Sequence, residues 1–74
     1  MATARGDHTP PNPVKPAGPH APHWNTAMEK ALESARNDPS WPKHAQVSCR
    51  VDRQILVTGN PGDVRTYSVI LETI

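Results

Sequence analysis

Residues 45–74 read AQVSCRVDRQILVTGNPGDVRTYSVILETI, and the pattern of this stretch predicts most of the fold. Its first half, residues 45–58, alternates apolar and polar side chains with a period of two, which is typical of a strand with one wet face. The alternation slips at Asp52-Arg53, where we expect a bend or a bulge. Residues 59–63 then place proline and glycine where a type II turn needs them, and residues 64–73 predict a returning strand. The stretch therefore predicts an antiparallel β-hairpin.

The segment before the hairpin, residues 26–37, has the pattern of an amphipathic helix. Thr26 and Glu29 form the capping sequence T-x-x-E at its start, and Pro39 follows its end, where proline disfavours helical geometry in the preceding residue. We expect its apolar face to pack on one face of the hairpin, with Trp41 closing one end of the core. This face repeats at helical spacing and consists of Met28, Ala31, Leu32 and Ala35.

The first 23 residues differ in composition from the rest of the chain. They hold six of the nine prolines, and Val14 is their only large apolar side chain after Met1. Five of these prolines, from Pro10 to Pro22, recur every third residue, which is the period of a polyproline II rod. Such a segment buries too little surface to offset its ordering entropy. We therefore predict a disordered arm over residues 1–23, acting as a spacer or a docking peptide, and one small domain over residues 24–74.

Charge and cysteine content limit the classes of partner and compartment. The formal net charge is +1, which favours neither nucleic acid nor an anionic membrane as a partner. The one candidate for nucleic-acid contact is a set of three arginines that could share a strand face, Arg50, Arg53 and Arg65. The single cysteine permits no internal disulfide, and the polar start of the chain has no apolar segment of a secretory signal. We therefore expect a cytoplasmic protein.

Residues that could perform chemistry are present but do not form a recognisable constellation. His20 and His23 have the spacing of a metal-ligand pair, yet a second pair is missing, and His8 and His44 are isolated. Cys49 lies within a strand on the apolar parity, which predicts a buried thiol and not a nucleophile. Paired carboxylates occur only on the solvated face of the helix. The sequence therefore predicts a protein that is not an enzyme and that needs no metal or cofactor.

The hairpin predicts self-association. A hairpin with one helix is barely stable alone, and here apolar side chains occur on both of its expected faces. We expect an α+β domain, one helix packed on a two-stranded hairpin (αββ), whose sheet is completed by self-association. The corresponding function is that of a small non-enzymatic accessory or interaction protein, acting as a homo-oligomer or docking on a larger partner. The candidate interface residues are Leu56, Val64, Tyr67, Ile70, Ile74 and Trp41.

Part of this pattern resembles the dodecins, which are small high-order oligomers that bind flavin between tryptophans. The residues that carry the resemblance are Ala27-Met28-Glu29-Lys30-Ala31, then Trp41, then Tyr67-Ser68-Val69-Ile70-Leu71. Three features depart from it: dodecins have a strand where this chain is proline-rich, Pro42-Lys43-His44 separate the tryptophan from its strand, and Ser68 replaces a flavin-contacting glutamine. The resemblance implies an alternative function, a flavin-type ligand-binding oligomer with Trp24 or Trp41 as the stacking surface.

Overall fold

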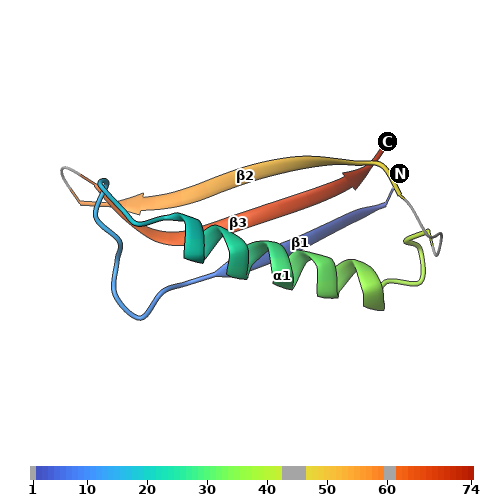
Figure 1. Ribbon diagram of the computed structural model, residues 1–74, viewed down its shortest axis with the longest axis horizontal. Coiled ribbons are helices and arrows are strands. Elements are labelled where there is room, and N and C mark those ends of the chain that lie inside the picture. Colours follow the sequence, from blue (N-terminus) through green and yellow to red (C-terminus); the bar gives the residue numbers. More distant parts are fainter. Residues whose placement is uncertain (1, 43–46, 60–61) are drawn as a thin grey trace.

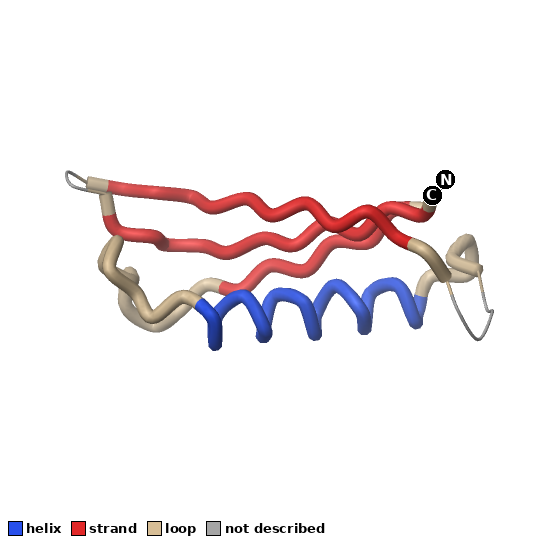
Figure 2. The backbone as a smooth tube through the Cα atoms, turned by 45° about the horizontal axis from the view of Figure 1, so that its top comes forward, coloured by secondary structure: helices blue, strands red, loops and turns tan. Residues whose placement is uncertain are grey.

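The computed structural model describes residues 2–42, 47–59 and 62–74, which form one helix and a three-stranded antiparallel sheet (Figure 1). The sheet has the order β1-β3-β2, so that β3 is central, and α1 forms a second layer on one side of it (Figure 2). The architecture is therefore α+β, as the sequence predicts. In chain order the elements are β1 (Thr3–His8), α1 (Ala21–Asn37), β2 (Cys49–Thr58) and β3 (Asp63–Thr73).

Strand β1 is the main difference from the sequence prediction. It pairs antiparallel with β3, from Thr3 opposite Glu72 to His8 opposite Tyr67. The expected disorder is therefore wrong for these residues, and the expected two-stranded hairpin is a three-stranded sheet. The sequence pattern does not predict this strand, because the side of β1 that faces α1 carries Ala4, Gly6 and His8, which give almost no hydropathy signal.

The proline-rich segment between β1 and α1 also lies against the domain. The backbones of Val14 and Val64 exchange hydrogen bonds of 2.9 and 2.8 Å. Helix α1 starts at Ala21, earlier than predicted, with Pro22 in its first turn, where a missing N–H costs nothing. Thr26 therefore lies within the helix, and its hydroxyl donates to the Pro22 carbonyl at 3.0 Å instead of capping the N-terminus.

Strands β2 and β3 pair antiparallel, from Cys49 opposite Thr73 to Thr58 opposite Asp63. The register shifts between Leu56 and Val57, closer to the turn than the predicted bend at Asp52-Arg53. This shift brings Val64 onto the same side of the sheet as Tyr67, and both are buried. Residues 43–46 and 60–61 lie outside the described residues, so the start of the predicted strand and the centre of the predicted turn are not compared.

The core between α1 and the sheet is built largely from small side chains. The distance between the two layers is short enough that a Cβ atom at Gly6 would overlap backbone atoms of Ala27 and Ala31. Trp41 is buried in the same core, as expected for a residue that closes one end. The buried hydrophobic residues are Ala2, Ala4, Ala27, Ala31, Ala35, Trp41, Val64, Tyr67, Val69 and Leu71.

Helix α1 lies over β1 and β3 and leaves β2 uncovered (Figure 2). The domain is therefore elongated, with extents of 43 × 19 × 16 Å. Its radius of gyration is 13.7 Å, against about 11 Å for a compact chain of this length. Among the described residues, no helix is both long enough and apolar enough to cross a membrane.

Candidate functional site

One side of β2 presents an apolar row that nothing in the described chain covers. Val51, Ile55 and Val57 lie on the side of the sheet that carries α1, because their partners on β3 are core residues. The helix does not reach them, and each remains about half exposed, between 46% and 50%. We call these residues, together with Arg53 between them, the β2 row. Their partners on β3 are Leu71, Tyr67 and Val64.

The flank of α1 that faces β2 is apolar as well. Trp24 marks this flank, because the guanidinium of Arg53 lies 5.5 Å from the centre of its ring. Met28 and Leu32 follow at intervals of four residues, and so they lie along the same side of the helix. Trp24 and Met28 pack partly against the core, while Leu32 is 49% exposed. The β2 row and this flank therefore form the two sides of an apolar groove.

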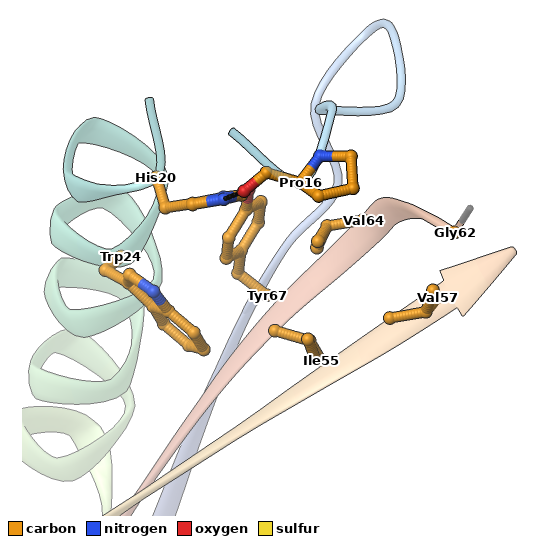
Figure 3. Close-up of a pocket in the computed structure, with 8 residues that line it drawn as sticks. All are labelled: Pro16, His20, Trp24, Ile55, Val57, Gly62, Val64 and Tyr67. Atoms are coloured by element: carbon orange, nitrogen blue, oxygen red, sulfur yellow. Dashed lines mark hydrogen bonds between the residues drawn. The ribbon is translucent and has the colours of Figure 1, made fainter. Parts of the chain in front are cut away.

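At the end of the groove nearest the β2–β3 turn lies a hollow of about 300 Å³ (Figure 3). This volume is at the lower limit of small-molecule pockets, and most of the lining is apolar. Trp24 and Tyr67 line one side of the hollow, and the end of the β2 row lines the other. The residues that line it are Pro16, His20, Trp24, Ile55, Val57, Gly62, Val64 and Tyr67.

The Tyr67 hydroxyl and both ring nitrogens of His20, which lie beside this hollow, already have hydrogen-bond partners. The Tyr67 hydroxyl lies 2.6 Å from Nδ1 of His20, and Nε2 of His20 lies 2.9 Å from the Pro16 carbonyl oxygen. A carbonyl only accepts, so Nε2 donates to it, and in neutral His20 Nδ1 accepts from Tyr67. Burial raises the pKa of the Tyr67 hydroxyl above its usual value of 10.0. The hollow therefore offers a mainly apolar lining, in which the side-chain polar groups of His20 and Tyr67 are already paired.

A pair of histidines joins β1 to α1. Nε2 of His8 lies 3.1 Å from Nδ1 of His23, the two rings are stacked with centres 5.2 Å apart, and His23 stacks in turn on Tyr67. One nitrogen of the pair must donate and the other accept, so two protonated rings would place N–H groups against each other. Desolvation lowers the pKa of His8, and the nearby positive charges of His23 and Lys30 lower it further.

We expect the His8–His23 pair to make the domain less stable in mild acid. Because the pKa of His8 is lower in the folded state than its usual 6.5, the unfolded chain binds the proton first. The stabilisation that neutral His8 gives to the folded state is complete above pH 6.5 and decreases as the pH falls toward the pKa of His8 in the folded protein. Urea unfolding at about pH 7.5 and about pH 5.5 measures this loss, which should be smaller in His8→Gln.

An equal acid loss in His8→Gln and in the natural sequence would assign the effect to another group. Asp7 does not titrate in this range. A hydrogen bond from the Ser68 hydroxyl lowers the pKa of Asp7 below its usual 3.8, and the nearby Arg5 makes a smaller contribution in the same direction.

The opposite face of the sheet is polar and internally paired. Nε of Arg5 contacts Oδ1 of Asp7 at 3.0 Å, and the Ser68 hydroxyl donates to the same carboxylate at 2.5 Å. Arg50 and Glu72 lie 3.9 Å apart on this face. These pairs indicate a solvated surface.

The six residues expected at an interface lie in different parts of the structure. Val64, Tyr67 and Trp41 belong to the core between α1 and the sheet. Leu56 and Ile74 are exposed and Ile70 is half-buried, with Leu56 and Ile70 on the polar face. The β2 row was not among the expected residues, because its alternation assigns it to the face that the helix covers. Only the displacement of α1 toward β1 leaves it uncovered.

The other chemistry-bearing residues do not gather into a site. Within residues 2–42, 47–59 and 62–74, no three histidine, cysteine, aspartate or glutamate side chains form a group that could hold a metal ion. His44 lies outside these ranges. Cys49 is a free, partly buried thiol whose Sγ lies 3.8 Å from the Val47 carbonyl oxygen.

No family model, no curated protein and no solved structure matches this chain.

Proposed function

We propose that this chain is a non-enzymatic interaction protein that acts as a homo-oligomer, with β2 and the apolar groove beside it as the interface. One observation carries the proposal: small side chains fill half of the core while many large apolar ones stay exposed. Among the described residues, five of the ten buried hydrophobic residues are alanines. The large hydrophobic residues that remain exposed are Leu32, Val51, Ile55, Leu56, Val57 and Ile74.

The position of these exposed side chains supports an interface over a random scatter. Single exposed apolar residues are normal, whereas a contiguous set is typical of interaction sites. Three of the six lie on the same side of β2, with Arg53 between Val51 and Ile55, and Leu32 lies on the facing flank of α1. A second copy that lies alongside β2 would join its own row to this one and reduce the exposure of both rows.

Light scattering of the full chain over a concentration series tests this proposal. The expected result is a mass of two or more copies at micromolar concentration, falling toward one copy on dilution. A folded protein with the mass of one copy at every concentration would overturn it. Amide exchange provides a second measurement, because β2 amides should become more protected as the concentration rises.

The hollow at Trp24 favours a second candidate function, binding of a flat aromatic ligand. Trp41 is buried in the core, which leaves Trp24 as the accessible tryptophan of the two. The presence of β1 also removes one departure from the dodecin pattern, since a strand does precede the helix. Saturable quenching of tryptophan fluorescence by flavin mononucleotide would support this candidate, and its absence at micromolar flavin would remove it.

A further inference from the structure

The outer edge of β2 has no neighbouring strand within the described chain. It lies at the end of the sheet order, and no described segment pairs with it along the strand. Soluble proteins blunt such edges with proline, charged side chains (lysine above all), short strands or bulges. Strand β2 runs for ten residues, Cys49–Thr58, without proline or lysine, and the register shift places the extra residue on β3. By contrast, the β1 edge is only six residues long.

We infer that two copies pair antiparallel through their β2 strands about a two-fold axis at Gln54, forming one continuous six-stranded sheet. This inference rests on the proposed function, because it specifies the partner and the register of the same interface. A two-fold axis normal to the sheet keeps each face on its own side. Residues that face each other across the axis therefore share parity, which leaves only a few possible registers.

Charge selects among these registers, because like charges directly opposite each other destabilise a sheet. An axis at Asp52 places two aspartates face to face, and an axis at Arg53 does the same with two arginines. An axis at Val51 pairs unlike charges but overlaps only the first half of β2. An axis at Gln54 gives the longest overlap that places no like charges opposite.

The Gln54 register also unites the apolar rows. Val51 of each copy lies opposite Val57 of the other copy, on the side of the sheet that carries α1. Arg53 lies opposite Ile55 of the second copy, and Asp52 lies opposite Leu56, so each β2 charge faces an uncharged side chain. The two β2 rows then form one continuous apolar surface between the two helices. Backbone N–H and C=O groups at the edge of β2, which are unpaired in one copy, bond to those of the other copy.

A charge exchange at the axis tests the pairing. Gln54 is exposed, so Gln54→Glu and Gln54→Lys should both fold. Each variant alone places like charges face to face and should dissociate up to about fivefold more readily than the natural sequence. An equal mixture should form mixed dimers at least as tightly as the natural sequence, because the two side chains then attract. Homodimers of either variant as tight as the natural sequence would overturn the Gln54 axis.

A cysteine scan locates the residue of β2 that lies on the two-fold axis. In a Cys49→Ser background, single cysteines are placed in turn at positions 51 to 55 and oxidised mildly. Two residues directly opposite each other in a sheet have Cα atoms close enough for a disulfide. Two copies of any residue away from the axis are not directly opposite, so their Cα atoms lie further apart. Gln54→Cys should form the disulfide-linked dimer fastest. Fastest linkage at another position overturns the register. An oligomer by light scattering with no linkage at any position overturns edge pairing and leaves the proposed function standing, whereas a single copy overturns both.

Discussion

Replacement of Gly6 by alanine is expected to destabilise the domain more than any other change of one methyl group. The added Cβ would lie 2.8 Å from the carbonyl carbon of Lys30, and closer still to the backbone nitrogen of Ala31 and the backbone oxygen of Ala27. Extra methyl groups in a packed core cost about 1 to 3 kcal/mol when side chains can adjust. Here the obstacle is helix backbone, which cannot rotate away, so α1 must move off β1.

The expected loss for Gly6→Ala is about 3 kcal/mol or more. In a domain of this size it corresponds to a fall in Tm of at least about 12 °C. Thermal unfolding followed by circular dichroism, at one protein concentration for all variants, measures it. Thr3→Ala, an exposed substitution in the same strand, provides the matched control and should change Tm little.

Adding Ala31→Gly to Gly6→Ala should not restore stability, because the clash is with backbone and not with the Ala31 side chain. A Tm for Gly6→Ala near that of the natural sequence would mean that α1 does not lie against β1 at this point.

The same close approach explains what sequence patterns could and could not predict about the helix. Its existence and its C-terminal end follow from the apolar period and from Pro39. Its buried face follows only in part: Ala31 and Ala35 belong to the predicted apolar face and are buried, but hydropathy ranks Met28 and Leu32 above alanine and so centres that face on them. In the structure the buried stripe is Ala27, Ala31 and Ala35, since only small side chains fit between α1 and β1.

The candidate site was beyond sequence reasoning for a related reason. Alternation along β2 correctly separates its two faces, but it cannot show which of them the helix leaves uncovered. That depends on β1, a strand whose inward side chains are alanine, glycine and histidine, and whose place in the sheet rests on backbone pairing with β3. Once β1 is in place, α1 lies over β1 and β3, and the β2 row is exposed.

The second large effect is expected at Tyr67, which is fully buried on the central strand. Its ring stacks on His23 at 5.1 Å and receives the edge of Trp24 at 4.9 Å, while its hydroxyl bonds to His20. Tyr67 therefore connects the start of α1 and the proline-rich segment to the sheet. Removal of a buried aromatic ring costs about 3 to 5 kcal/mol, so Tyr67→Ala should lose most of the stability of a small domain.

Tyr67→Phe keeps the ring and separates the contribution of the hydroxyl. It should cost about 1 to 2 kcal/mol, because the phenylalanine ring fits the same space but leaves Nδ1 of His20 without its donor. Urea unfolding of both variants measures the difference. Equal losses in the two variants would mean that the hydroxyl, and not the ring packing, holds this end of the domain together.

Alkaline titration gives an independent reading, because Tyr67 is the only tyrosine in the chain. Burial raises its pKa, so folding favours the neutral hydroxyl. The stabilisation from this group is complete below about pH 10 and is lost as the pH rises through the folded pKa. Phenolate absorbance should therefore appear later in the folded protein than in urea. Coincident titration curves would place the hydroxyl in solvent and contradict its burial between His20 and the sheet.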